Sequence, residues 1–104
     1  MNNKTLTLLG FCRKAGRLTV GSAKTTELLK DKKGCLVVVA EDVSQKTEKE
    51  LKYFAEKNSC GRVIRLTVNT DVLSKAIGIK AGVVATCDEG FMKAILEEEI
   101  TYGD

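Results

Sequence analysis

The segment "CLVVVA", residues 35–40, constrains the fold more than any other stretch of this chain. It is a continuous apolar run rich in β-branched residues, with no polar residue alternating along it. Such a run is typical of a strand that is buried on both faces of a sheet. A sheet with a covered centre needs helices on both sides, so this one segment favours a layered α/β domain.

The rest of the chain alternates between helical and strand-like segments. We expect strands at 17–20, 35–40, 62–68 and 83–87, and helices at 4–15, from 22 to about 31, and after the capping residues Ser44, Asn69 or Thr70, and Asp88. Gly78 is expected to end the fourth helix. Arg62 and Arg65 indicate that the third strand lies at an edge. The predicted fold is an α/β, three-layer α/β/α sandwich with a four-stranded mixed sheet, and residues 1–104 form one domain.

The apolar spacing of each helix predicts which side chains face the core. They are Leu8, Leu9, Cys12 and Ala15 in the first helix, Ala23, Leu28 and Leu29 in the second, Thr47, Leu51, Phe54 and Ala55 in the third, Val72, Leu73, Ala76 and Ile77 in the fourth, and Phe91, Met92, Ile95 and Leu96 in the last.

Composition argues against an enzyme and against a metal site. The chain has no histidine, which removes the usual general base near neutral pH and the commonest zinc ligand. The four cysteines, at 12, 35, 60 and 87, form no CxxC pair. We expect thiols buried in a reducing cytoplasm, with Cys35 and Cys87 packed as small hydrophobic residues. No cofactor is expected.

The hydropathy pattern disfavours a membrane-associated protein and a protein with a signal peptide. No stretch approaches 18 uninterrupted apolar residues, so no membrane association is expected. The N-terminal segment has the pattern of an amphipathic helix and lacks the separate basic head and apolar core of a signal peptide. A cytoplasmic location follows from this reasoning.

Charge is distributed unevenly along the chain. Residues 1–34 hold eight Lys or Arg and two acidic residues, whereas residues 81–104 hold one and six. The basic N-terminal third indicates an anionic partner, although a solvated surface of mixed charge is the plain alternative.

The stretch "AGRLTVGSAKTTELL", residues 15–29, raises the question of a phosphate-binding P-loop. A P-loop needs its lysine directly after the second glycine, but Ser22 and Ala23 separate Gly21 from Lys24. Two extra helical residues rotate the lysine by about 200° around the helix axis. The glycine pattern therefore predicts a helix start and no nucleotide hydrolysis.

That helix start is the main candidate site. Gly21, Ser22 and Ala23 offer unpaired backbone N–H groups at the positive end of a helix dipole. We expect four cations to surround it, namely Arg13, Lys14, Arg17 and Lys24. This combination suits a phosphodiester backbone, and an ordinary capped helix start is the alternative.

The segments "GSAKTTELLKDKKGCLVVVAEDVS" and "VLSKAIGIKAGVVAT" closely resemble the ribosomal kink-turn RNA-binding family of the archaeal large-subunit protein 7Ae/30e type. The leading "LLGFCRKAGRLTVG" is similar to its bacterial YlxQ-like branch. The resemblance covers about residues 4–96 and implies the same three-layer sandwich. It also implies contacts to RNA from the start of the second helix, from Glu41 and Asp42, and from the loop of Ile79, Lys80, Ala81 and Gly82, whose apolar atoms cover a flipped-out nucleotide.

The sequence departs from the family pattern at the helix start. Ala23, Lys24 and Glu27 stand where the family has an amide-bearing Asn, an acidic residue and a phosphate-contacting Lys. A carboxylate accepts from guanine N–H groups, but an ammonium group accepts nothing. Lys24 instead favours phosphates or guanine acceptor atoms.

The resulting prediction is a non-catalytic RNA-binding protein of ribosomal-protein type that grips structured ribosomal or other non-coding RNA. No DNA partner is expected. The alternative is a protein-interaction domain that keeps the fold and has lost kink-turn recognition.

Overall fold

A computed structural model describes residues 3–31, 33–57 and 61–103. The elements follow in the order α1 (Asn3–Lys14), β1 (Thr19–Val20), α2 (Ser22–Lys30), β2 (Cys35–Val39), α3 (Gln45–Lys57), β3 (Gly61–Arg65), α4 (Thr70–Ile77), β4 (Val83–Thr86) and α5 (Glu89–Gly103). The predicted alternation of helices and strands is confirmed, although the first and third strands are shorter than expected.

The four strands form one mixed sheet in the order β1-β4-β2-β3. At its centre, Val37 of β2 pairs with Val63 of the parallel strand β3 and with Ala85 of the antiparallel strand β4. β1 pairs antiparallel with the other side of β4. β3 is an edge strand, as its two arginines indicate, and both arginines are exposed.

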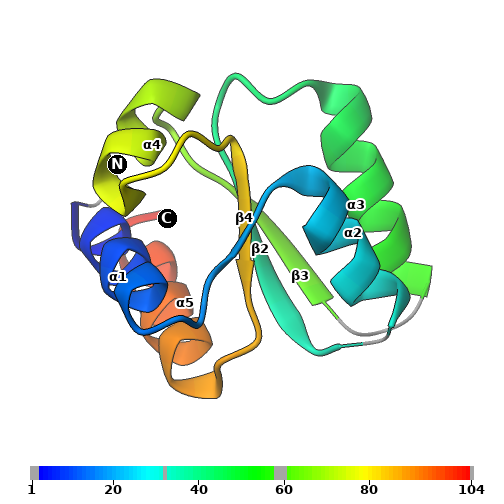
Figure 1. The fold of residues 1–104 in the computed structure, drawn as a ribbon, viewed down its shortest axis with the longest axis horizontal. Coiled ribbons are helices and arrows are strands. Elements are labelled where there is room, and N and C mark those ends of the chain that lie inside the picture. The colour runs from blue at the N-terminus through cyan, green and yellow to red at the C-terminus, as the bar shows by residue number, and fades with distance from the viewer. Residues whose placement is uncertain (1–2, 32, 58–60, 104) are drawn as a thin grey trace.

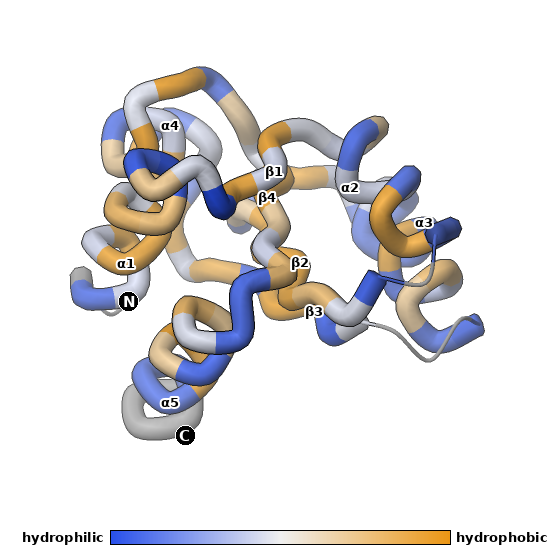
Figure 2. The backbone as a smooth tube through the Cα atoms, turned by 60° about the horizontal axis from the view of Figure 1, so that its bottom comes forward, coloured by the Kyte–Doolittle hydropathy of each residue, from blue (hydrophilic) through white to orange (hydrophobic). Residues whose placement is uncertain are grey.

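The sheet separates two helical layers. Figure 1 shows α1, α4 and α5 on one face and α2 with α3 on the other. All five residues of β2 are buried, because successive side chains point alternately into the two layers. Leu36 and Val38 join the cluster beneath α1, α4 and α5, whereas Val37 and Val39 join the cluster beneath α2 and α3. Figure 2 shows the same division, with hydrophobic strands inside and hydrophilic residues on the outer helices. The three-layer α/β/α sandwich is therefore confirmed.

Four residues expected to be buried are exposed instead. Ala15 lies in the turn that follows α1, and Ala23 lies in the first turn of α2. Val72 is 40% exposed near the start of α4, and Cys87 lies just past the end of β4. Thr25 is fully buried, and its hydroxyl is satisfied there because it donates a hydrogen bond to the carbonyl of Gly21. Cys12 and Cys35 are buried as predicted, and Cys60 lies outside the described residues.

Candidate functional site

The start of α2 is anchored to the sheet by the backbone of Gly21. Its N–H donates to the carbonyl of Val83 in β4, with 2.8 Å between nitrogen and oxygen. Its carbonyl accepts from the backbone N–H and from the hydroxyl of Thr25. Gly21 adopts φ 103° and ψ 149°, a conformation that only glycine occupies without strain.

The start of α2 differs from the starts of the other helices after α1 because its N-cap residue has no side chain. The caps of α3, α4 and α5 are Ser44, Asn69 and Asp88, whose side-chain oxygens accept from Thr47, Val72 and Phe91 respectively. At Gly21 there is no such acceptor. The first N–H groups of a helix have no partner within it, so those of Ser22, Ala23 and Lys24 depend on solvent or on a ligand. All three residues are exposed.

Two loops are tied together at the same end of the sheet. The N–H of Ala40 donates to the carbonyl of Gly82 at 2.9 Å. Gly82 packs so closely that an added Cβ would lie 2.9 Å from the hydroxyl of Thr70. The carboxylate of Asp42 accepts from the N–H and the hydroxyl of the same threonine, at 2.8 and 2.7 Å. The loop after β2 and the loop before β4 therefore share one rigid attachment to α4.

These loops lie beside the start of α2, because Gly82 directly precedes Val83, the residue that bonds to Gly21. In Figure 1 the three segments meet at the upper end of the sheet. We call this region the helix-tip surface. It consists of residues 21–24, 41–42 and 79–82.

Within the loop before β4, side chains differ in what they offer a ligand. Ile79 is 41% exposed, and Lys80 is exposed as well. Ala81 is 8% exposed and belongs to the core, and its N–H donates to the hydroxyl of Ser74 at 3.0 Å. The expectation that Ala81 supplies apolar contact to a base is therefore not supported by its position. Ile79 remains as the apolar group of this loop.

The formal charges of the helix-tip surface balance. Lys24, Lys80 and Glu41 are exposed. The hydrogen bond from the Thr70 hydroxyl is the main cause that lowers the pKa of Asp42, so this carboxylate is ionised at neutral pH. Attraction of an anion here is consequently local, from the two lysines and from the positive end of α2.

Arg17 does not lie at the helix tip, contrary to the sequence-based expectation. Its carbonyl accepts from the hydroxyl of Thr86, at the far end of β4, and its Nε lies 3.9 Å from the carboxylate of Asp88. The reason is that the chain is extended from Arg17 to Gly21 and runs antiparallel to β4. Four extended residues span roughly 13 Å, so the two residues lie at opposite ends of the strand pair.

Arg13 and Lys14 occupy the end of α1. The Nη1 of Arg13 donates to the carbonyl of Ile77 at 3.2 Å, where its charge opposes the negative end of α4. Arg13 therefore lies at the start of the loop before β4, and the residue that follows this loop, Val83, bonds to Gly21. Lys14 is exposed in the last turn of α1.

Arg65 is a residue whose role was missed. It donates to the carbonyls of Glu41 and Val43, both at 2.6 Å, and pairs with the carboxylate of Glu48. Arg65 thus holds the loop after β2 in place. Its position at the end of β3, beside the end of the parallel strand β2, is the signal that could have revealed this contact.

The fold and this open surface define a small three-layer α/β/α protein with a helix start and two loops presented at one end of its sheet. The chain belongs to the ribosomal protein L7Ae/L30e/S12e/Gadd45 family, whose model matches residues 3–96.

Solved structures agree with this assignment. The chain is similar to a protein of unknown function from Bacillus halodurans C, with 25% identity and a TM-score of 0.82 over 92% of this chain and 96% of the other. It shares its fold with the Giardia lamblia 15.5kD RNA binding protein, with 14% identity and a TM-score of 0.71 over 97% of this chain and 89% of the other. A comparison with curated protein sequences gives no significant match.

Across the described ranges 3–31, 33–57 and 61–103, no helix is long and apolar enough to cross a bilayer. The same ranges bring no three His, Cys, Asp or Glu side chains together as metal ligands.

Proposed function

We propose that this protein is a non-catalytic RNA-binding protein that grips structured RNA, ribosomal or otherwise non-coding, through its helix-tip surface. The observation that carries the proposal is the exposed start of α2, which has no capping side chain and adjoins an exposed Ile79–Lys80 loop. Membership of a ribosomal-protein family supports RNA as the partner. The Giardia lamblia 15.5kD RNA binding protein has the same fold.

The chemistry of the helix tip favours phosphate over base recognition. The N–H groups of residues 22–24 point away from the helix and suit a phosphate oxygen or a purine acceptor atom. Lys24 adds a charged donor at the same place. Ala23 supplies no side-chain hydrogen bond at all. We therefore expect recognition of a bent or looped RNA by its shape, with limited dependence on base identity.

Ile79 would cover an unstacked base. It is the exposed apolar residue of the loop before β4, and hydrogen bonds to Ser74 fix that loop on both sides of it, from the N–H of Gly78 to the Ser74 carbonyl and from the N–H of Ala81 to the Ser74 hydroxyl. A fixed loop loses little conformational freedom on binding, which favours affinity.

A salt titration with matched variants tests the proposal. The probe is a fluorescent RNA duplex interrupted by a three-nucleotide bulge and tandem G·A pairs, compared with the fully paired duplex. The two lysines of this surface, Lys24 and Lys80, predict a slope of log affinity against log salt of about −1.8. Lys24→Ser should weaken binding roughly tenfold and reduce the slope by about one unit. Arg17→Ser is the matched control, because it removes one charge at the opposite end of the strand pair.

Equal effects of the two substitutions would refute the assigned surface. Binding of neither RNA below micromolar concentration would instead support the alternative, a protein-interaction domain that has lost RNA recognition.

A further inference from the structure

A second surface, on α3, combines an exposed aromatic ring with lysines. Tyr53 is 56% exposed. The edge of its ring packs against Phe54, with 5.2 Å between the ring centroids and 74° between the planes. The ammonium group of Lys57, one turn further along α3, lies 5.5 Å from the centre of the Tyr53 ring. The Lys57 ammonium group therefore covers one face of the ring, and the rest of the ring remains exposed.

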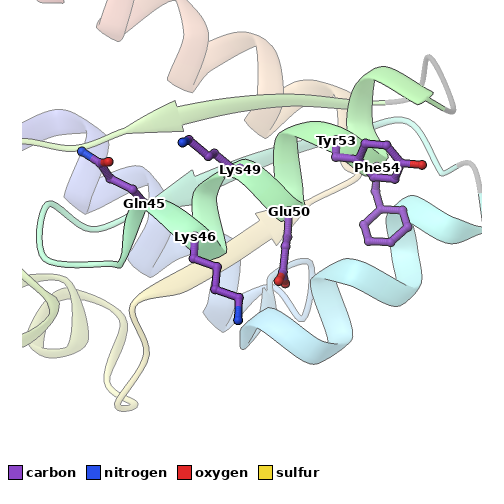
Figure 3. Close-up of a pocket in the computed structure, with 6 residues that line it drawn as sticks. All are labelled: Gln45, Lys46, Lys49, Glu50, Tyr53 and Phe54. Carbon is purple, nitrogen blue, oxygen red and sulfur yellow. The ribbon is translucent and has the colours of Figure 1, made fainter.

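The N-terminal side of Tyr53 borders a hollow of about 830 Å³. Figure 3 shows the six lining residues, which all belong to α3: Gln45, Lys46, Lys49, Glu50, Tyr53 and Phe54. Lys46, Glu50 and Phe54 reach toward α2, whereas Lys49 points away from it. Lys46 and Glu50 therefore lie on the side of the hollow that faces α2, and Lys49 lies on the opposite side.

This hollow continues to the helix-tip surface. A smaller hollow of about 370 Å³ lies between α2 and α3, and Glu50 lines both. The smaller hollow begins at Ser22 and Ala23, which belong to the helix tip, and extends to Lys30. The ammonium group of Lys30 lies 5.2 Å from the centre of the Phe54 ring. The two hollows together connect the start of α2 to Tyr53, and their charged lining consists of three lysines, Lys30, Lys46 and Lys49, and two carboxylates, Glu27 and Glu50.

We propose that the α3 face binds a single-stranded segment of RNA that extends from the helix-tip surface along the α2–α3 groove. This inference rests on the proposed function. A base stacks on Tyr53, Lys46 and Lys49 contact phosphates, and the carboxylate of Glu50 accepts from a base amino group. Lysines outnumber carboxylates along this path, and cations beside an exposed aromatic ring are a combination by which proteins hold single strands with little sequence preference.

Two probes that differ only in a single strand test this inference. One is the bulged G·A duplex described above, and the other is the same duplex carrying a ten-uridine single-stranded extension, prepared at either end. For the unaltered protein, the extension at one of the two ends should tighten binding about tenfold relative to the bulged duplex without an extension. A gain of this size is expected when bases stack on aromatic rings.

Tyr53→Ala should abolish the gain in affinity that the extension gives and leave the affinity for the bulged duplex without an extension unchanged. Tyr53→Phe should keep that gain. Lys46→Ser with Lys49→Ser should reduce the salt slope for the extended RNA by about 1.4. Lys52→Ser is the matched control, because Lys52 lies on the same helix but pairs with Glu48 and lines a different hollow. Thermal melting checks that each variant is folded.

The outcomes separate the two proposals. An extension that adds no affinity, or that adds as much to Tyr53→Ala as to the unaltered protein, overturns the α3 surface and leaves the helix tip standing. If the bulged G·A duplex without an extension does not bind, the α3 surface is tested with single-stranded dodecauridylate as the probe. Tyr53-dependent binding of this probe supports the α3 surface without the tip, and its failure to bind overturns the inference in favour of a protein partner.

Discussion

Replacing Gly21 by L-alanine should destabilise the protein through the backbone alone. An added Cβ would meet nothing within 4 Å, so no steric clash with neighbours contributes. The cost comes from φ 103° and ψ 149°, which an L-residue adopts only under a strain of about 1–3 kcal/mol. For a domain of this size, such a loss lowers the melting temperature by roughly 4–12 °C.

Handedness provides the sharpest control, because a D-residue prefers positive φ. D-alanine at position 21 should destabilise less than L-alanine, because φ 103° is favourable for a D-residue although ψ 149° lies outside the mirror image of the β region. The junction between Gly34 and Cys35 permits ligation of a synthetic 1–34 thioester to a recombinant 35–104 fragment. Urea denaturation of the glycine, L-alanine and D-alanine proteins then gives three comparable free energies of unfolding.

Gly16→Ala offers a second comparison, since Gly16 has φ 72° and its Cβ would also meet open space. Position 16 lies in the left-handed region, which costs an L-residue about 1–2 kcal/mol. The reasoning about Gly21 is refuted if L-alanine is neutral there, or if D-alanine destabilises as much as L-alanine does.

Two other contacts give independent predictions. Hydrogen bonding to Arg65 is the main cause that lowers the pKa of Glu48. The pair therefore stabilises the fold fully at any pH above the ordinary glutamate pKa of 4.5. That contribution is lost as the pH falls through the lower pKa that Glu48 has in the folded state. Arg65→Ala should therefore be less stable at pH 7 and lose less stability on acidification than the unaltered protein, and urea denaturation at pH 7 and pH 3 that shows equal losses would contradict this. Gly10→Ala should destabilise by about 1–3 kcal/mol, because its Cβ would lie 2.8 Å from the carbonyl oxygen of Ala76. Glycine-to-alanine changes inside helices usually stabilise, so a gain in melting temperature would show that α1 and α4 are further apart than described.

The sequence was sufficient for the layered architecture because its strongest signals are local. The unbroken apolar run at 35–39 has no acceptable position except the centre of a covered sheet. The caps at Asn69 and Asp88, and the left-handed stop at Gly78, are also set by single residues and their immediate neighbours. Signals of this kind do not depend on which strands pair.

The grouping of cations failed because it depends on pairing. A strand at 17–20 places Arg17 and Gly21 a strand length apart, whereas grouping Arg17 with the helix start assumes that residues close in the chain are also close in space. The partner of Arg17 is Asp88, which becomes its neighbour only once β1 and β4 run antiparallel. The clamp made by Arg65 likewise requires β3 to lie parallel to β2.

The two boundaries of the sheet bear on how the protein avoids self-association. β1 forms one boundary with only two residues, and β3 forms the other with exposed arginines at 62 and 65. A strand from another molecule could form only a few hydrogen bonds along β1. Pairing with β3 would instead require it to bury the charges of the two arginines. The most apolar strand, β2, is thus flanked on both sides by strands of its own chain and offers no free edge to another molecule.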